Sequence, residues 1–373
     1  MDLRPGRRAA AASLSLLTGL GALGLAPAAD ARDHGHGSSG GLEVVATGLD
    51  NPRHLDISGG ALYVAEAGVG GAGPCFAGAE GDTCYGATGA ITRVRHGRQT
   101  RVVTGLPSAA DPGTGGGAVG PSDLVVRGHR YTVALGLGAD PGERAGQPRG
   151  IRLLGTVATG RLGSAGLRVV ADVGGYEARV NPDGTDLDTN PVALLPRGGR
   201  TYVVDAGGNA LLRLGRHGGI RTTAVFPSVV TPVPGGVVDM DAVPTAVAQG
   251  PDGALYVSQL TGFPFPVGAA SIWRVVPGQA PTRYATGLTN VTDLAFDRDG
   301  SLYVVQVTDQ GLAAEAPPLG SVVRVPRGGG AAHTTVRGGL LLPYGIALHH
   351  GSAYVTTGSA LADAGQVVRI PLR

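Results

Sequence analysis

Carboxylate and amide residues recur at one position of a repeated pattern in this chain. The apolar stretch GALYVA is followed by Glu66, GRTYVV by Asp205, and two similar stretches by glutamine. The glutamines are Gln259 and Gln306. Asparagine begins, or directly precedes, a second kind of apolar run, at Asn51, Asn190 and Asn290. Oxygen-bearing side chains of these types are the ligands that a hard cation such as calcium prefers.

The repeated pattern also indicates which elements position these side chains. Each unit holds an apolar run such as NPRHLDI, a run around a tyrosine, and a run that ends in Arg and a β-branched residue, and a fourth run usually follows. The tyrosines are Tyr63, Tyr131, Tyr202, Tyr256, Tyr303 and Tyr354. Four-stranded units repeated at about fifty residues are typical of a β-propeller, where each sheet is buried against its neighbours. We therefore predict an all-β fold, a six-bladed β-propeller of four-stranded antiparallel blades over residues 42–373.

The two ends of the chain supply the last blade together. The sixth unit holds only three apolar runs, while LEVVATGL, from Leu42, has no partner in the first unit. We predict that this amino-terminal strand completes the last blade and closes the ring, because closure hides two strand edges.

Loop lengths distinguish the two rims of such a propeller. Short turns such as PDG and DRDG join the first and second strands, whereas long connections such as 67–88 and 136–150 belong to the opposite rim. Variable loops on a rigid scaffold commonly carry binding sites. The end of each second strand and the start of each first strand share this loop-rich rim. We predict a calcium site there, made by Asn51, Glu66, Asn190, Asp205 and Asn290. We predict a ligand-binding rim made by His54, Asp123, Gln259, Asp293 and Gln306. The alternative for the asparagines is a turn, which Asn before Pro favours.

The amino terminus predicts export. A basic segment with Arg4, Arg7 and Arg8 precedes an apolar segment and an Ala-Asp-Ala cleavage motif, so residues 1–31 read as a signal peptide and 32–41 as a flexible leader. We expect no membrane span after cleavage. In an oxidising compartment an even pair of cysteines favours a bridge, which predicts a disulfide between Cys75 and Cys84.

Charge and motifs exclude several classes of function. The 30 basic residues are all arginine, they are scattered, and the net charge is only +2, so the chain offers no basic stripe for nucleic acid. A nucleophile elbow, a zinc-protease helix motif, a P-loop and a dinucleotide fingerprint are absent from the sequence. These absences favour a binding protein over the commoner enzyme classes.

Four stretches resemble a known family. They are VATGLDNPRHLDI, DTNPVALL, DGALYVSQLTGFPFPVGAASIWRV and LPYGIAL, and the third is the specific one. Through them the chain resembles the ScyD/ScyE family of secreted proteins over residues 42–373, and more distantly the NHL-type and gluconolactonase-type propellers. The resemblance implies a propeller with an extracytoplasmic role and brings no assigned reaction. The gluconolactonase-type likeness implies calcium held by oxygen ligands near the axis.

The leading interpretation is a secreted, non-catalytic binding or scaffold protein that presents its loop-rich rim to a small molecule, a glycan or a protein. One alternative is a calcium-dependent hydrolase of lactones or esters. Another is a quinone-dependent sugar dehydrogenase, which would need a histidine base such as His54. The chain has no lysines to hold the carboxylates of such a cofactor. A structural role is the other interpretation of this histidine.

Overall fold

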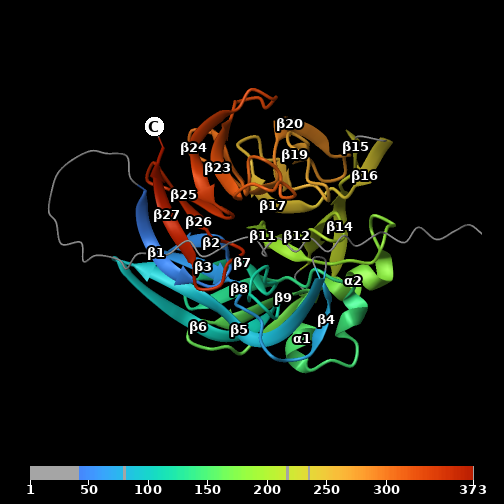
Figure 1. Cartoon of the computed structure of the whole chain (residues 1–373), viewed down its shortest axis with the longest axis vertical. Helices are drawn as coiled ribbons and strands as arrows, with labels where there is room; N and C mark the ends of the chain where they lie inside the picture. The colour runs from blue at the N-terminus through green and yellow to red at the C-terminus, as the bar shows by residue number, and fades with distance from the viewer. Residues whose placement is uncertain (1–41, 79–80, 216–217, 234–235, 373) are drawn as a thin grey trace, which may run out of the picture. The chain divides into compact units, whose positions relative to one another are not determined.

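The computed structural model describes residues 42–78, 81–215, 218–233 and 236–372. The predicted signal peptide and leader lie outside these residues. The described chain forms a six-bladed β-propeller of four-stranded antiparallel sheets, which confirms the predicted fold (Figure 1). Within the described residues, no helix is long and apolar enough to cross a membrane.

The first three blades follow one another along the chain. Blade 1 consists of β2 (Pro52–Ser58), β3 (Ala61–Glu66), β5 (Gly81–Arg95) and β6 (Arg98–Ala110), with β4 (Cys75–Gly78) added to β5. Blade 2 consists of β7 (Pro121–Arg127), β8 (Arg130–Leu135), β9 (Thr156–Arg161) and β10 (Arg168–Asp172). Blade 3 consists of β11 (Pro191–Arg197), β12 (Arg200–Asp205), β13 (Ala210–Leu214) and β14 (Ile220–Val225).

The other three blades complete the ring. Blade 4 consists of β17 (Pro244–Gln249), β18 (Leu255–Gln259), β19 (Ala270–Val275) and β20 (Thr282–Leu288). Blade 5 consists of β21 (Val291–Phe296), β22 (Leu302–Gln306), β23 (Leu319–Val325) and β24 (Thr334–Leu341). Blade 6 consists of β25 (Ile346–His349), β26 (Ser352–Thr357), β27 (Gly365–Pro371) and β1 (Glu43–Leu49).

Four short additions interrupt this order. A 3₁₀ helix, η1 (Pro141–Arg144), and α1 (Arg149–Leu153) lie in the connection between β8 and β9. Helix α2 (Val173–Val180) precedes blade 3, and the hairpin of β15 (Val229–Val233) and β16 (Gly236–Met240) precedes blade 4.

The amino-terminal strand closes the ring, as predicted. β1 pairs antiparallel with β27, with Glu43 opposite Arg369 and Leu49 opposite Gly365. Figure 1 shows this pairing as a blue strand beside a red one. The Arg369 guanidinium also binds the Glu43 carboxylate at 2.9 Å. The innermost strands of neighbouring blades contact one another around the whole ring, including β2 against β25.

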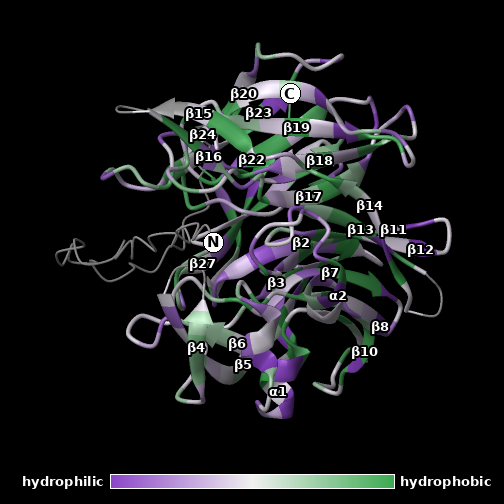
Figure 2. Cartoon of the chain, turned by 90° about the vertical axis from the view of Figure 1, so that its right-hand side faces the viewer, coloured by the Kyte–Doolittle hydropathy of each residue, from purple (hydrophilic) through white to green (hydrophobic). Residues whose placement is uncertain are grey.

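Burial on both faces explains why the second strands are largely apolar. All six residues of β3, ALYVAE, are buried, because one face of the blade packs on each neighbouring blade. Hydrophobic colour accordingly concentrates in the strands (Figure 2). The turn before β3 uses Gly59 and Gly60, whose φ angles of 58° and 72° lie in the left-handed region that a tight hairpin turn requires.

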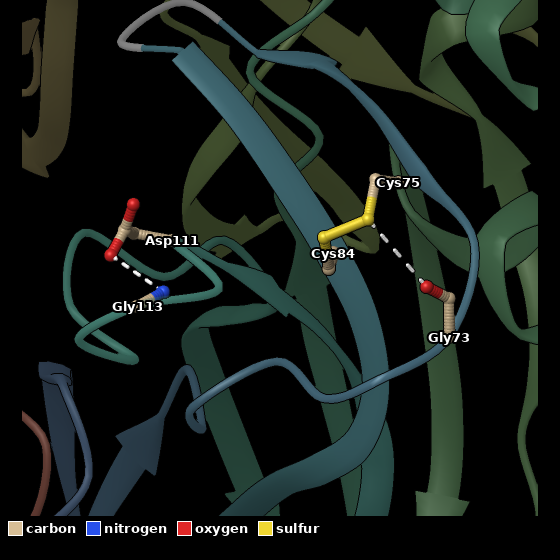
Figure 3. The surroundings of a disulfide bond; sticks show 5 residues. All are labelled: Gly73, Cys75, Cys84, Asp111 and Gly113. Carbon is tan, nitrogen blue, oxygen red and sulfur yellow. Dashed lines mark hydrogen bonds between the residues drawn. A yellow bond between two sulfur atoms is a disulfide. The ribbon is translucent and has the colours of Figure 1, made fainter.

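The two rims differ as predicted in the length of their connections. The loop-rich rim carries the connections between second and third strands and those between blades, and the turn-rich rim carries the remaining hairpin turns. On the loop-rich side of blade 1, Cys75 of β4 and Cys84 of β5 face each other and form the predicted disulfide, with an S–S distance of 1.95 Å (Figure 3). The bridge thus links the short strand β4 to β5, which is the third strand of the blade.

Candidate functional site

The polar residues at the ends of the second strands hold the starts of the innermost strands. Glu66, Asp205 and Gln306 each accept the backbone N–H of a residue just before the innermost strand of their own blade, at 2.9, 2.6 and 2.7 Å respectively. The recurrence of an acceptor at this position therefore has a structural reason. It fixes the path of the chain where one blade passes into the next.

In blade 1 the carboxylate that does this is neutralised by an arginine. Glu66 is fully buried, and its Oε2 lies 2.7 Å from Arg101 Nη2 of the outermost strand. Thr92 donates a further hydrogen bond to Oε1. The hydrogen bond to Glu66 raises the pKa of Arg101, and the charges of Glu66 and Asp50 reinforce that effect against partial burial. The buried charge is thereby paired and hydrogen-bonded.

In blade 3 the equivalent carboxylate lies among other acids. Asp205 accepts hydrogen bonds from the Thr189 hydroxyl at 2.8 Å and from the Asn190 backbone. Burial raises its pKa to about 6, and the charge of Asp188 adds to that rise. Burial raises the pKa of Glu177, on α2, to about 8, and the charges of nearby aspartates add to it. Within the described residues, one carboxylate oxygen of Glu177 and one of Asp188 are buried without a hydrogen-bond partner.

The three asparagines connect loops to strands. Asn51 and Asn290 adopt left-handed backbone angles, with φ of 48° and 42°. The amide of Asn51 donates to the carbonyls of Gly68 and Gly115 at 2.7 and 2.8 Å. That of Asn290 donates to Leu260 O at 2.9 Å. The left-handed angles of Asn51 and Asn290 agree with the turn interpretation. Asn190 Oδ1 is buried without a hydrogen-bond partner among the described residues.

The predicted calcium ligands are brought together only in part. Asn190 and Asp205 are in contact in blade 3, whereas Glu66 is paired with Arg101 in blade 1. Among the described residues, no group of three His, Cys, Asp or Glu side chains is arranged to hold a metal ion. The calcium site, with its asparagine ligands, stays a prediction.

Three of the five residues predicted for the ligand-binding rim meet at the propeller axis. His54 of β2, Asp123 of β7 and Asp293 of β21 come from three different blades, and all three are at most 8% exposed. His54 Nδ1 lies 3.8 Å from Asp123 Oδ2. The sequence places these residues some 70 to 240 positions apart, so only the closed ring brings them together.

Backbone groups of the next blade hold both aspartates of this axial cluster, which consists of His54, Asp123 and Asp293. Asp123 accepts the N–H of Leu194 of β11 at 2.6 Å, and Asp293 accepts that of Ile346 of β25 at 2.7 Å. Each carboxylate therefore links its own blade to the next one. Both carboxylates accept backbone N–H groups.

Burial and charge oppose each other in the axial cluster. Burial lowers the pKa of His54, but the charges of Asp293 and Asp123 outweigh it, so the pKa is raised above its ordinary value. Burial raises the pKa of Asp293 to about 6, against the effect of His54. The Tyr344 ring lies 5.2 Å from the His54 ring, and His54 Nε2 is buried without a partner among the described residues. An imidazole with one free nitrogen beside two acids is able to transfer a proton.

The two glutamines lie within their blades instead. Gln259 accepts a hydrogen bond from Trp273 Nε1 at 3.1 Å, and Gln306 donates to Asp309 at 2.8 Å. Neither has a hydrogen bond to the axial cluster among the described residues. Their role as ligand-binding residues stays a prediction.

A loop of blade 4 presents apolar side chains on the loop-rich rim. Between β18 and β19 the chain exposes 53% of Phe263 and 64% of Val267. We call residues 260–269 the Phe263 loop. Thr261 and Phe265 of this loop hold left-handed φ angles of 78° and 54°, which residues with a Cβ adopt at a cost in energy. No sequence pattern marks these side chains as a site, although GFPFPVG lies in the stretch that resembles the ScyD/ScyE family.

The base of the Phe263 loop is fastened to its surroundings. Leu260, Thr261 and Gly262 donate backbone hydrogen bonds to residues 243, 242 and 241, at 2.9, 3.2 and 2.9 Å. The Thr289 hydroxyl accepts the N–H of Gly268 at 3.1 Å. The predicted site residue Asn290 binds the Leu260 carbonyl, so it supports this loop from blade 5.

Comparison with solved structures finds other β-propellers. The chain is similar to a luciferin-regenerating enzyme at 10% identity and a TM-score of 0.51, over 89% of this chain and 95% of that one. It is similar to a glucose dehydrogenase at 14% identity and a TM-score of 0.50, over 89% and 100%. A structural genomics protein of unknown function from Bacteroides thetaiotaomicron VPI-5482 matches at 11% identity and a TM-score of 0.50, over 89% and 72%. The likeness is one of fold. No family model and no curated protein matches this chain.

Proposed function

We propose that this protein is an exported binding propeller of the ScyD/ScyE type, without catalytic activity, whose loop-rich rim takes up a small molecule, a glycan or a protein. The disulfide between Cys75 and Cys84 supports export, because such bridges persist in oxidising compartments. The amino-terminal segment is the signal that directs it there.

The observation that carries the proposal is the Phe263 loop. Exposed apolar side chains on a fastened loop lose little conformational entropy when they are covered, so they are suited to binding. Aromatic side chains such as Phe263 supply much of the contact area in binding sites. The left-handed angles at Thr261 and Phe265 fit this interpretation, because strain of this kind clusters at functional sites.

The polar residues of the same rim support the proposal in a second way. Glu66, Asn290 and Gln306, which the sequence marks as candidates for chemistry, are engaged with backbone or side-chain partners. These contacts hold the rim loops in place. A rim whose loops are already held in place is suited to binding a ligand.

The test uses a double variant of the Phe263 loop, Phe263→Ser with Val267→Ser. Wild-type protein and variant are applied to a glycan array and titrated with a panel of small aromatic compounds. Val44→Ser, at a residue of β1 that is 49% exposed, is the matched control. We expect at least one probe that binds wild type and control but binds the double variant at least about tenfold more weakly, a loss of about 1.4 kcal/mol. Probes that bind all three proteins alike contradict this site.

The axial cluster favours a second candidate function, hydrolysis of a lactone or an ester. Its carrying observation is the free Nε2 of His54 beside two buried aspartates. The test is a panel of lactones and esters, with and without a chelator, on wild type and His54→Asn. His96→Asn, at an exposed residue of blade 1, is the control. Turnover by wild type and control that is lost in His54→Asn would favour this candidate over binding alone.

A further inference from the structure

A cavity rich in arginine lies on the turn-rich rim, away from the Phe263 loop and the axial cluster. It measures about 550 Å³ and lies between blades 3 and 4. Its charged lining consists of Arg197, Arg200, Arg213, Arg274 and Asp252. Ligand pockets in proteins commonly measure about 300 to 1,000 Å³, so the cavity is large enough for an organic molecule.

Strand pairing brings the arginines of blade 3 together. Arg197 and Arg200 face each other across the turn between β11 and β12. Arg213 of β13 lies opposite Tyr202, and Tyr202 shares one face of β12 with Arg200 because strand side chains alternate. Tyr202 packs in the same core cluster as Ala254 of blade 4, so this face looks toward that blade. The guanidinium groups therefore gather where the two blades meet.

The charges of this cavity are poorly balanced. Arg274 is paired with Asp252, with 2.7 Å between Nε and Oδ2. In the described part of the chain, Arg197, Arg200 and Arg213 form neither a salt bridge nor a side-chain hydrogen bond. The one carboxylate of the described lining, that of Asp252, is paired with Arg274, so these three guanidinium groups line the cavity without a bound carboxylate. A guanidinium group presents its donors in a planar fork that matches two oxygens of an anion.

We propose that this cavity binds a small organic anion, a phosphate or sulfate ester. The oxyanion head lies among Arg197, Arg200 and Arg213, whose forks bind its oxygens in pairs. The organic body lies against Tyr202, Val276 and Pro277, the less polar part of the lining. The cavity has room for such a body, because a bare oxyanion fills only a small part of 550 Å³.

The experiment is calorimetric titration at constant ionic strength. The probes are glucose 6-phosphate and glucose 6-sulfate, with inorganic phosphate, inorganic sulfate and glucose as partial ligands. The variants Arg200→Gln and Arg213→Gln each remove one donor fork. Arg130→Gln is the matched control, because Arg127 and Arg130 face each other across the corresponding turn of blade 2 and lie outside the cavity. Melting temperatures are recorded for every variant.

We expect one ester to bind wild type and Arg130→Gln equally, and to bind each cavity variant about tenfold more weakly or worse, which is about 1.4 kcal/mol. The ester that binds more tightly shows whether the site prefers a phosphate or a sulfate head group. A loss in Arg130→Gln as large as in the cavity variants overturns the proposal, because it reveals only general attraction to a basic surface. Binding of inorganic anions as tight as that of the esters overturns the assigned organic body. Absence of millimolar binding by every probe overturns the site, and leaves the binding function of the Phe263 loop untouched.

Discussion

In blades 1 and 3 a buried carboxylate accepts the same backbone hydrogen bond, but the charged groups around the two carboxylates differ. Glu66 and Asp205 are the last residues of equivalent strands, and each accepts a backbone N–H at the start of its innermost strand. Glu66 is paired with Arg101, whereas the pKa of Asp205 is raised to about 6 by burial and by a neighbouring acid. A repeated backbone position therefore does not determine which charged groups surround the side chain that occupies it.

The difference originates in two residues of the outer strands. In blade 1, Thr92 lies opposite Arg101, and both bind Glu66. The corresponding pair in blade 3 is Leu212 and Thr222. Thr222 instead lies 2.9 Å from the Tyr176 hydroxyl of α2. Thr222 stands where blade 1 has Arg101, and in the part of the chain that the structure describes Asp205 forms no salt bridge.

The largest effect is expected from Arg101→Ala. This change leaves Glu66 buried without its counter-charge, and we expect a loss of about 2 to 3 kcal/mol in the free energy of unfolding, moderated because Arg101 is 38% exposed. Urea unfolding followed by circular dichroism measures it. Thr222→Ala, at the equivalent position of blade 3, removes only the exposed hydrogen bond between the Thr222 and Tyr176 hydroxyls and is expected to cost less than about 1 kcal/mol. Equal losses of stability at the two positions would contradict the claim that Arg101 stabilises a buried charge in blade 1.

The next effect concerns pH and Glu177. The pKa of Glu177 is raised from 4.5 to about 8, so between these values the folded chain binds its proton more tightly than the unfolded chain does. The free energy of unfolding therefore falls as pH rises from about 4.5 to about 8, and this contribution is complete below about pH 4.5. We expect Glu177→Gln to remove this part of the pH dependence in unfolding experiments with a chelator present. Glu315→Gln, at an exposed residue, is the control, and a slope that it changes as much would contradict the assignment.

A titration with calcium tests whether the acids of blade 3 bind a cation. If the predicted ligands bind the ion, calcium at about four times its Kd stabilises the fold by about 1 kcal/mol through mass action. We expect Asp205→Asn to reduce the accompanying rise in melting temperature more than Glu66→Gln does, because Arg101 already neutralises Glu66. A transition that neither calcium nor chelator moves would show that the prediction of a calcium site is wrong.

The smallest effect is expected in blade 5, where the acceptor is neutral. Gln306→Met removes the hydrogen bond from the Thr289 N–H and leaves no buried charge unpaired. We expect a loss of about 1 kcal/mol, measured as a lower melting temperature. Gln310→Met, at an exposed residue nearby, is expected to change it far less. A loss as large as that of Arg101→Ala would mean that charge pairing contributes little in blade 1.

Sequence patterns were sufficient for the architecture. The six tyrosine-bearing runs, the turn glycines and the unpaired run from Leu42 predicted the blades and the closure of the ring. The even pair of cysteines in a chain expected to be exported predicted the disulfide. These features are readable because strand periodicity and turn chemistry are local properties of the chain.

Side-chain partners were decided by the tertiary structure. The pairing of Glu66 with Arg101 spans 35 residues, and the meeting of His54 with Asp293 needs the first and fifth blades to point at one axis. The sequence placed both acids of the repeat on one rim but could not say that one faces an arginine and the other faces Asp188 and Glu177. Electrostatic energy depends on distances of a few ångströms between atoms from separate strands, and only the closed ring determines those distances.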